Sequence, residues 1–131
     1  VPDDDAEALQ IGHYDVGEKY ELHLDTDPTN EVARPATMII YLNEAESGGE
    51  TMFPLTAAAR SPCTGWNTNA NGSQVYGIIN CCSEDDPDRL RIPSKTGRAV
   101  LFWNHDIVGT KDSRSEHAAC PVKRGEKWIA P

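Results

Sequence analysis

Every apolar stretch of this chain is short, and this limits the folds open to it. The run Met38–Leu42 has the length of a strand, whereas a membrane-spanning helix needs about 20 consecutive apolar residues. The chain contains 10 glycines and 9 prolines, which indicates many turns between such runs. Its 131 residues fit one domain. We therefore expect a single folded, loop-rich domain, residues 1–131, without a membrane span.

Short β-like segments follow one another along the chain, and turn residues separate them. There is no internal repeat, no heptad pattern and no long amphipathic helix. The expected strands cover Ala8–Val16, Lys19–Leu24, Pro35–Asn43, Glu50–Phe53, Arg89–Pro93, Arg98–Asn104, Glu116–Val122 and Glu126–Ala130. The expected turns lie at 17–18, 48–49, 94–97 and 123–125. Such a series predicts a mainly β sandwich or double-sheet jelly roll with low helix content.

The charge balance is acidic, with 12 Lys and Arg residues against 21 Asp and Glu residues and a net charge of −9. Nucleic acids are bound mainly through clustered Lys and Arg side chains that contact phosphates. The composition therefore argues against a nucleic-acid partner, and it places no limit on catalysis.

Four cysteines lie at Cys63, Cys81, Cys82 and Cys120. The polar segment 64–80 has too few apolar residues to order itself, so we expect a disulfide from Cys63 to Cys81 or Cys82. Cys120 then takes the remaining cysteine or stays reduced, and a bond between the adjacent Cys81 and Cys82 is the least favoured pairing. Together with an Asn71-Gly72-Ser73 glycosylation pattern, this favours the secretory route, with the endoplasmic reticulum lumen ahead of the cytoplasm.

The chemistry of the chain centres on His23-Leu24-Asp25. Residues two apart on a strand point to the same face, so this imidazole and this carboxylate can approach one metal ion. A third ligand has to come from elsewhere, and the candidates are His13, His105 and His117. Two histidines and one carboxylate with open positions form the facial triad of non-haem Fe(II) oxygenases.

A structural zinc site is the main alternative metal centre. It would normally fill all four positions, often with cysteine. Cys120 lies at an odd offset from His117 and should face away from it on a regular strand. This spacing disfavours a His/Cys zinc site.

Four ordered motifs resemble the catalytic domain of the prolyl 4-hydroxylases, which are Fe(II)- and 2-oxoglutarate-dependent dioxygenases. The motifs are the segments 14–25 with the His-x-Asp pair, 34–43, 48–54 with Gly-Gly-Glu-Thr, and 117–128 with His-Ala-Ala-Cys-Pro. The resemblance covers most of the chain outside the cysteine-bearing insert, residues 57–88. It implies a double-stranded β-helix, a cupin-like jelly roll.

The resemblance also implies roles for individual residues. It makes His23, Asp25 and His117 the iron ligands and Lys127 the partner of the distal carboxylate of 2-oxoglutarate. A buried carboxylate needs such a cationic partner. For the remaining family positions, it assigns cosubstrate contacts to Tyr14 and Thr51 and peptide contacts to Tyr20 and Arg34.

The implied reaction hydroxylates prolyl residues in peptides or proteins while 2-oxoglutarate is decarboxylated to succinate. Fe(II), 2-oxoglutarate and O2 are the expected cofactors, with ascorbate as reductant. The alternatives left open are an oxygenase for another residue or a small molecule, and a catalytically silent metal-binding jelly roll. Against the family pattern, we expect the chain to lack an N-terminal helical segment and the last strand.

Overall fold

The computed structural model describes residues 7–26, 34–55, 64–68, 72–78, 82 and 89–131. Within these residues the chain is built of short strands, and the helical content is one turn of 3-10 helix, η2 (Ser113–Ser115). None of the helical structure described is long and apolar enough to cross a membrane. The prediction of a mainly β chain with low helix content is confirmed.

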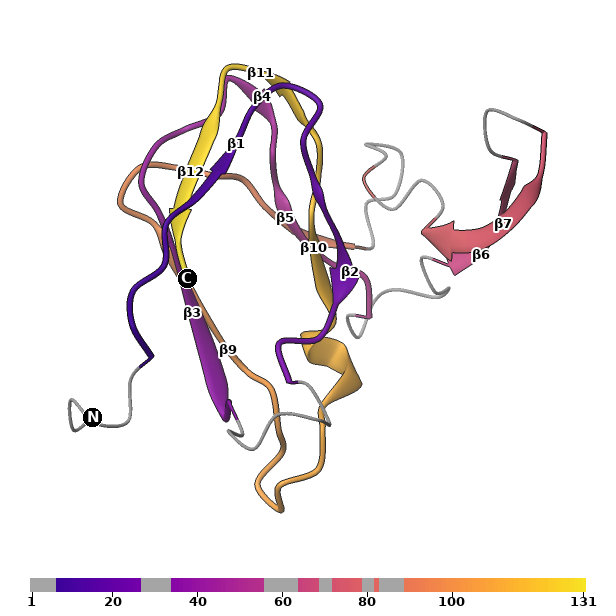
Figure 1. Ribbon diagram of the computed structural model, residues 1–131. Helices are drawn as coiled ribbons and strands as arrows, with labels where there is room; N and C mark the ends of the chain where they lie inside the picture. The colour runs from indigo at the N-terminus through magenta and orange to yellow at the C-terminus, as the bar shows by residue number, and fades with distance from the viewer. Residues whose placement is uncertain (1–6, 27–33, 56–63, 69–71, 79–81, 83–88) are drawn as a thin grey trace.

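Two four-stranded antiparallel sheets face each other and form the body of the molecule (Figure 1). The first sheet has the order β1 (Gly12–Tyr14), β12 (Lys127–Ala130), β3 (Ala36–Tyr41), β9 (Ala99–Trp103). The second has the order β2 (Tyr20–His23), β10 (His117–Ala119), β5 (Thr51–Phe53), β8 (Leu90–Ile92). The chain passes repeatedly from one sheet to the other, which is the connectivity of a jelly roll.

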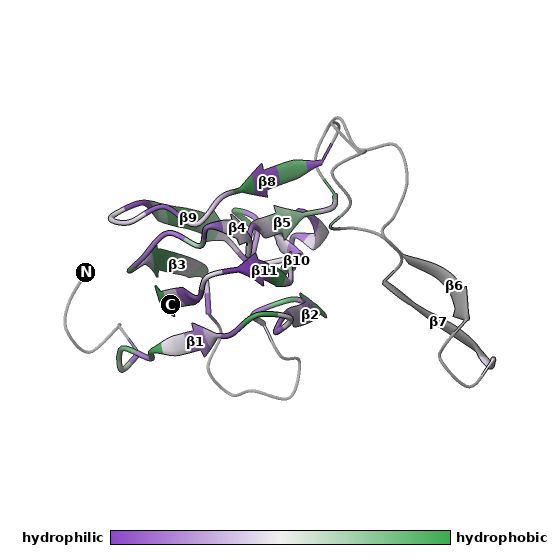
Figure 2. Cartoon of the chain, turned by 90° about the horizontal axis from the view of Figure 1, so that it is seen from above, coloured by the Kyte–Doolittle hydropathy of each residue, from purple (hydrophilic) through white to green (hydrophobic). Residues whose placement is uncertain are grey.

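Two smaller pairs complete the described strands. β4 (Ser47–Gly48) pairs with β11 (Val122–Arg124), and β6 (Thr64–Thr68) pairs with β7 (Gln74–Ile78). Seen from above, β1, β3 and β9 lie on one side of the body and β2, β5 and β8 on the other (Figure 2). The β6–β7 hairpin projects away from the main sheets (Figure 1). This hairpin lies inside the 57–88 insert, where no strand was predicted, because its Asn-, Gly- and Ser-rich sequence lacks an apolar alternation.

The strand period decides which side chains enter the space between the sheets. On β3, Ile39 and Tyr41 are buried whereas Met38 is half exposed. The apolar cluster inside the first sheet contains Ile39, Tyr41 and Ile129, with Tyr14, Ile92, Val100 and Phe102 packed against it. Alternation in these strands therefore builds the wall of the cavity that holds the candidate site.

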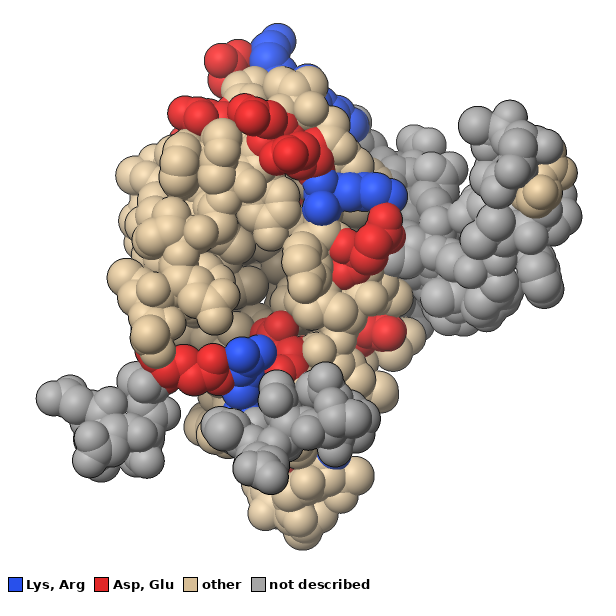
Figure 3. All heavy atoms as spheres, in the orientation of Figure 1, with Lys and Arg blue, Asp and Glu red and all other residues tan. Residues whose placement is uncertain are grey.

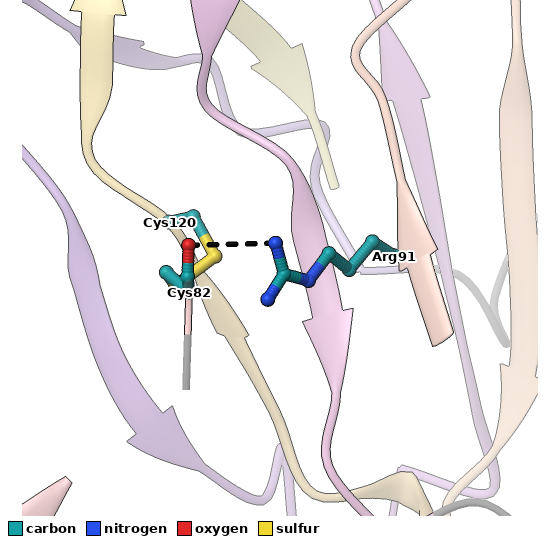
Figure 4. Close-up of a disulfide and its surroundings, with 3 residues drawn as sticks. All are labelled: Cys82, Arg91 and Cys120. Carbon is teal, nitrogen blue, oxygen red and sulfur yellow. Dashed lines mark hydrogen bonds between the residues drawn. A yellow bond between two sulfur atoms is a disulfide. The ribbon is translucent and has the colours of Figure 1, made fainter. Parts of the chain in front are cut away.

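A second apolar cluster lies behind β10. Met52, Ala118 and Cys120 are buried there, with Leu22 and Cys82 packed against them. Cys82 and Cys120 form a disulfide, and the carbonyl of Cys82 accepts a hydrogen bond from Arg91 (Figure 4). His117 packs instead against Phe53 and Phe102. The prediction that Cys120 faces away from His117 is confirmed.

The disulfide matches one of the pairings left open by the sequence. With Cys82 bonded to Cys120, the expected partner for Cys63 is Cys81. Both of these cysteines lie outside the described residues.

Several predicted boundaries are wrong. The strand expected over Ala8–Val16 covers only Gly12–Tyr14. The strand expected over Glu116–Val122 stops at Ala119, because Pro121 has no N–H to continue a ladder, and β11 then runs through part of the turn expected at 123–125.

The turn expected at Gly48-Gly49 is also a pairing site. Both glycines have positive φ, and a Cβ on Gly48 would lie 2.3 Å from the Pro121 carbonyl oxygen. Only glycine allows this close approach of β4 to β11. The two glycines therefore serve a strand contact as well as a change of direction.

Candidate functional site

Three predicted metal ligands meet at the end of the cavity where β2 and β10 lie side by side. His117 is paired with His23 across these strands, and the two imidazole centroids lie 4.3 Å apart. The Oδ1 atom of Asp25 lies 3.3 Å from His23 Nε2 and 3.8 Å from His117 Nε2. One ligand atom from each side chain lies within 4.8 Å of the others. The histidine that the structure brings to His23 and Asp25 is thus His117, and not His13 or His105.

Both histidines are oriented by backbone carbonyls. His23 Nδ1 lies 2.7 Å from the carbonyl oxygen of Glu21, and His117 Nδ1 lies 2.9 Å from that of Ser115. A carbonyl only accepts, so each Nδ1 must carry the proton and donate it. Because Nδ1 is committed to this donation, Nε2 is the nitrogen that faces the Asp25 oxygen and is left for a metal ion.

The surroundings of these three side chains also shift their pKa values. Burial opposes ionisation of Asp25, but its interactions with His23 and Thr37 and the nearby His117 lower the pKa of the carboxyl to about 2. Burial lowers the pKa of His117. For His23, burial is outweighed by Asp25 and by the Glu21 carbonyl, which raise its pKa. Asp25 is therefore ionised, as a metal ligand must be.

Two phenylalanines pack around His117. The Phe102 ring centroid lies 4.8 Å and the Phe53 centroid 5.5 Å from the imidazole, and the two phenyl rings meet edge to face at 5.2 Å. Sequence reasoning missed both residues as parts of the site. The sequence could have indicated them, because both lie on apolar strands, Phe53 close to the Gly-Gly-Glu-Thr segment and Phe102 close to Asn104. They keep the back of the metal cluster apolar.

Lys127 lies deeper in the same cavity. Its residue is 1% exposed, and Nζ has no hydrogen-bond partner within the described part of the chain. The rings of Tyr14 and Tyr41 lie 5.4 and 5.6 Å from Nζ. Burial lowers the pKa of Lys127 to about 8, although Glu50 opposes the shift. A buried and unpaired cation is a ready partner for an anionic ligand.

Thr51 and Tyr14 both lie near Lys127, as their predicted cosubstrate role requires. Thr51 is buried, and its Oγ1 accepts a 2.6 Å hydrogen bond from the hydroxyl of Tyr41. Tyr41 is completely buried and was missed as a site residue. It could have been found from the strand period, because Ile39 and Tyr41 share the inner face of β3.

The two predicted substrate residues lie nearer the surface. Tyr20 is 53% exposed, and its ring meets His23 edge to face at 4.4 Å. Arg34 forms a two-pronged ion pair with Glu7 and donates a 3.3 Å hydrogen bond to the carbonyl oxygen of Asp25. Both residues therefore lie beside the metal cluster, one on each side of the Asp25 segment.

The remaining histidines lie elsewhere. His13 stacks on Trp128 at 4.1 Å and forms an exposed group with Asp15 and Glu126. His105 forms a bridge with Lys111 in the loop after β9. Neither side chain joins the His23, Asp25 and His117 cluster.

The donor set fits an iron ion and a dicarboxylate together. Two neutral imidazole nitrogens and one carboxylate oxygen leave coordination positions free, as a facial triad does. The buried Nζ of Lys127 and the Thr51 hydroxyl then provide a cation and a hydroxyl for a distal carboxylate. Figure 3 shows a hollow between the two sheets through which ligands can enter.

Comparison with known proteins places the chain in a family. Residues 9–131 match the 2OG-Fe(II) oxygenase superfamily, and the chain belongs to it. Among its relatives is the Arabidopsis thaliana protein named "Probable prolyl 4-hydroxylase 3", which is 36% identical over 133 residues. Prolyl 4-hydroxylase 5 of the same plant is 34% identical over 133 residues. Each alignment covers 98% of this chain.

Solved structures confirm the fold. The 2OG complex of the viral collagen prolyl hydroxylase vCPH from Paramecium Bursaria Chlorella virus-1 matches 95% of this chain and 55% of the viral one. The two chains superpose with a TM-score of 0.59 and 27% sequence identity. The fold shared with this enzyme is a double-stranded β-helix, as predicted. The chain spans only 41 to 42% of the length of the two plant relatives.

Proposed function

We propose that this chain is the catalytic region of a prolyl hydroxylase that depends on Fe(II) and 2-oxoglutarate. One observation carries the proposal: the facial cluster of His23, Asp25 and His117 lies inside the same fold as the buried cation of Lys127, which has no hydrogen-bond partner among the described residues. The two parts are close enough for Lys127 to contribute to the lowered pKa of His117. The names of the plant relatives and of the viral enzyme support prolyl residues as the target.

The residues of the chain then have separate tasks. His23, Asp25 and His117 hold Fe(II) through Nε2, a carboxylate oxygen and Nε2. Lys127 pairs with the distal carboxylate of 2-oxoglutarate, and Thr51 and Tyr14 add hydrogen bonds. When bound, iron with O2 and 2-oxoglutarate supplies the oxidising power for C–H hydroxylation, with release of succinate and CO2.

The protein also keeps water and competing groups away from the metal. Phe53 and Phe102 form an apolar wall against His117 on that face of the site. The Nδ1–H groups of the two histidines stay hydrogen-bonded to the Glu21 and Ser115 carbonyl oxygens, which fixes the metal-binding tautomer throughout. Excluding water in this way limits side reactions.

We assign the proline-containing substrate to the side of the cluster where Tyr20 and Arg34 lie. The exposed Tyr20 ring beside His23 offers an aromatic surface for a prolyl ring. Arg34 is engaged by Glu7 and by the Asp25 carbonyl, so a peptide carbonyl would add to or replace these contacts. Its role then includes shaping the edge of the site as well as contacting peptide.

We also propose ascorbate as the reductant that keeps the iron in its ferrous state, and the secretory pathway as the compartment. The Cys82–Cys120 disulfide supports the second of these, because disulfides persist in oxidising compartments. Peptide mapping of the protein from its native source, with thiols blocked before lysis, tests the pairing. A free Cys82 and Cys120 there would contradict the assignment.

The reaction is tested by incubating the full chain with Fe(II), ascorbate, 2-oxoglutarate and a panel of proline-containing peptides. We expect succinate release coupled to the gain of one oxygen atom on proline, read by mass spectrometry. Succinate release with the oxygen on another residue or on a small molecule would reassign the substrate. No succinate release from protein that binds Fe(II) would favour a silent metal-binding jelly roll.

A further inference from the structure

A buried polar side chain lies behind Asp25 and has no part in the chemistry described so far. Asn104 follows β9 directly and is 0% exposed. Its Nδ2 donates a 2.9 Å hydrogen bond to Oγ1 of Thr37 on β3. The backbone N–H of Asn104 also donates to the Pro35 carbonyl, so its position is fixed on both sides. A fully buried amide in a β protein of this size calls for a specific role.

Thr37 lies between this amide and the metal cluster. It is paired in register with Phe102, whose ring contacts His117, so it lies on the inner face of β3 at the level of the cluster. It is also one of the neighbours that stabilise the ionised Asp25 carboxylate. The Thr37 hydroxyl is therefore the group of β3 that interacts with the Asp25 carboxylate.

Three buried polar atoms in the segments around Asp25 and Asn104 have no hydrogen-bond partner in the described part of the chain. They are Asp25 Oδ2, Thr26 Oγ1 and Asn104 Oδ1. Their segments are held together by hydrogen bonds from Lys111 Nζ to the Thr26 carbonyl and from the Asp112 N–H to the Asn104 carbonyl. The second oxygen of the Asp25 carboxylate is thus buried, and none of the described hydrogen bonds assigns a donor to it.

The hydrogen bond from Asn104 to Thr37 determines where the Thr37 hydroxyl can donate its own proton. A threonine hydroxyl has one proton, and the Asn104 amide occupies an acceptor position on its oxygen, so that proton is free for another acceptor. Asp25 Oδ1 already faces both Nε2 atoms, which leaves Oδ2 as the acceptor. If the Asn104 amide were turned so that its oxygen faced Thr37, the Thr37 proton would go to that oxygen and not to the Asp25 carboxylate. Hydrogen bonds to charged groups are stronger, which favours the orientation described.

We propose that Thr37 and Asn104 are positioning residues for Asp25: the Asn104 amide orients the Thr37 hydroxyl, which donates to Oδ2 and leaves Oδ1 for the metal. This inference rests on the proposed iron site. It makes Asp25 a one-oxygen ligand with a fixed rotamer, so the coordination positions needed by cosubstrate stay free. Outer hydrogen bonds of this kind commonly tune metal affinity.

The test measures metal affinity without cosubstrate or turnover. Co(II) is titrated into the metal-free chain, and its visible absorption reports both binding and coordination number. Thr37→Val removes the hydroxyl at nearly constant shape and should weaken Co(II) binding by roughly 10- to 100-fold. Thr37→Ser retains the hydroxyl and should bind within about threefold of the parent, since only a methyl group is lost.

Thr51→Val provides a matched control, because it makes the same change at a second threonine, which is buried. It should leave Co(II) affinity unchanged and weaken 2-oxoglutarate binding instead. Equal Co(II) affinity and spectrum for Thr37→Val and the parent chain would overturn the inference. If Asp25→Ala also left Co(II) affinity unchanged, the proposed iron site itself would be wrong, so the two failures are distinguishable.

A double substitution tests the order of the relay. Asn104→Ala should weaken Co(II) binding less than Thr37→Val does, and it should have no further effect in a Thr37→Val background. An additional loss in the double variant, equal to that of Asn104→Ala alone, would show that Asn104 acts by another route. Where Asn104→Ala does not fold, the Thr37→Val and Thr37→Ser pair still decides the inference.

Discussion

The two ends of the cavity are built on opposite principles. At the metal end, the proposed ligand atoms already lie against one another before any ligand arrives: His23 and His117 donate from Nδ1 to carbonyls, and their Nε2 atoms face Oδ1 of the Asp25 carboxylate. At the other end, Lys127 is buried among Tyr14 and Tyr41 without a hydrogen-bond partner in the described residues.

This difference determines how each end affects the stability of the ligand-free protein. A carboxylate between two imidazoles is already stabilised, as the pKa of Asp25 at about 2 indicates. A buried ammonium without a partner is destabilised, as the pKa of Lys127 at about 8 indicates. The metal end is thus preformed at little cost in stability, whereas the cosubstrate end weakens the empty fold and is relieved by an anion.

The largest expected effect is at the metal end. His23→Ala, Asp25→Ala or His117→Ala should each abolish turnover, because a site with three protein ligands has no redundancy. Succinate release and Fe(II) binding are measured at excess Fe(II), with Lys127→Ala as the control that keeps its metal. Substantial activity in any one of the three variants would remove that residue from the ligand set.

The next effect is at the cosubstrate end. Lys127→Ala should raise the 2-oxoglutarate requirement strongly, because it leaves a buried carboxylate unpaired at a cost of roughly 3 to 5 kcal/mol. Lys127→Arg should be tolerated in part, since the charge is retained and the larger guanidinium must still fit. Titration of 2-oxoglutarate against succinate release checks both variants. An unchanged requirement in Lys127→Ala would mean that another cation holds the carboxylate.

The disulfide behind the metal end should contribute to stability and leave the ligands in place. Cys82→Ser opens a covalent loop with a sequence separation of 38 residues. In the chain-entropy model this lowers the free energy of unfolding by roughly 3 to 4 kcal/mol. Thermal unfolding measures the loss, and Co(II) affinity at low temperature checks the site. Equal stability of parent and variant under non-reducing conditions would show that the bond contributes nothing.

A comparable but slightly smaller change in the opposite direction is expected from Lys127→Met. Below pH 8, Lys127 is charged in both the folded and the unfolded chain, and its pKa of about 8 against the usual 10.5 means that folding is penalised. The penalty is about 3 kcal/mol. It is relieved as pH rises from about 8 to 10.5, because the folded state releases its proton first.

Lys127→Met should therefore stabilise the empty protein at pH 7 and remove that pH-dependent gain. Urea unfolding at pH 7, 9 and 10.5 without 2-oxoglutarate measures both effects. If the difference in unfolding free energy between the parent chain and Lys127→Met stayed constant over this pH range, the assigned ionisation of Lys127 would be wrong.

The smallest expected effect concerns Tyr41, which was found only in the structure. Tyr41→Phe removes the hydrogen bond to Thr51 and frees the Thr51 hydroxyl to rotate. The loss of a neutral hydrogen bond of this kind is worth about 1 kcal/mol, so 2-oxoglutarate affinity should fall about fivefold. Calorimetric titration measures it, and Co(II) affinity should stay at the parent value. An equal fall in Co(II) affinity would mean that the two ends are coupled.

Much of this architecture could be predicted from the sequence because its information is local. Alternation predicts strands over Pro35–Asn43 and Arg98–Asn104, and β3 and β9 lie within these ranges. The two-residue spacing of His23 and Asp25 predicts a common direction for their side chains, and the two do converge. The other ligand, His117, followed from the resemblance of its motif to a known family.

The rest depends on contacts between distant segments. The pairing of β4 with β11 needs the close approach at Gly48, which no local pattern announces. The partner of Cys120 could not be selected among the possible pairings, and the relation of Asn104 to Thr37 joins residues 67 positions apart. The hydrogen bond from the Tyr41 hydroxyl to Thr51 also joins two different strands, and no local pattern indicates it.

The disulfide and the proposed iron site lie on opposite sides of β10, although the two need opposite redox states. β10 presents His117 toward the cavity, and the Cys120 sulfur lies behind it in an apolar cluster, where the residue is 2% exposed. An iron ion held by His117 has to stay reduced, whereas the bond to Cys82 has to stay oxidised. The burial of Cys120 limits the access of a soluble reductant to the cross-link, so a reductant that served the proposed iron site would not readily open it.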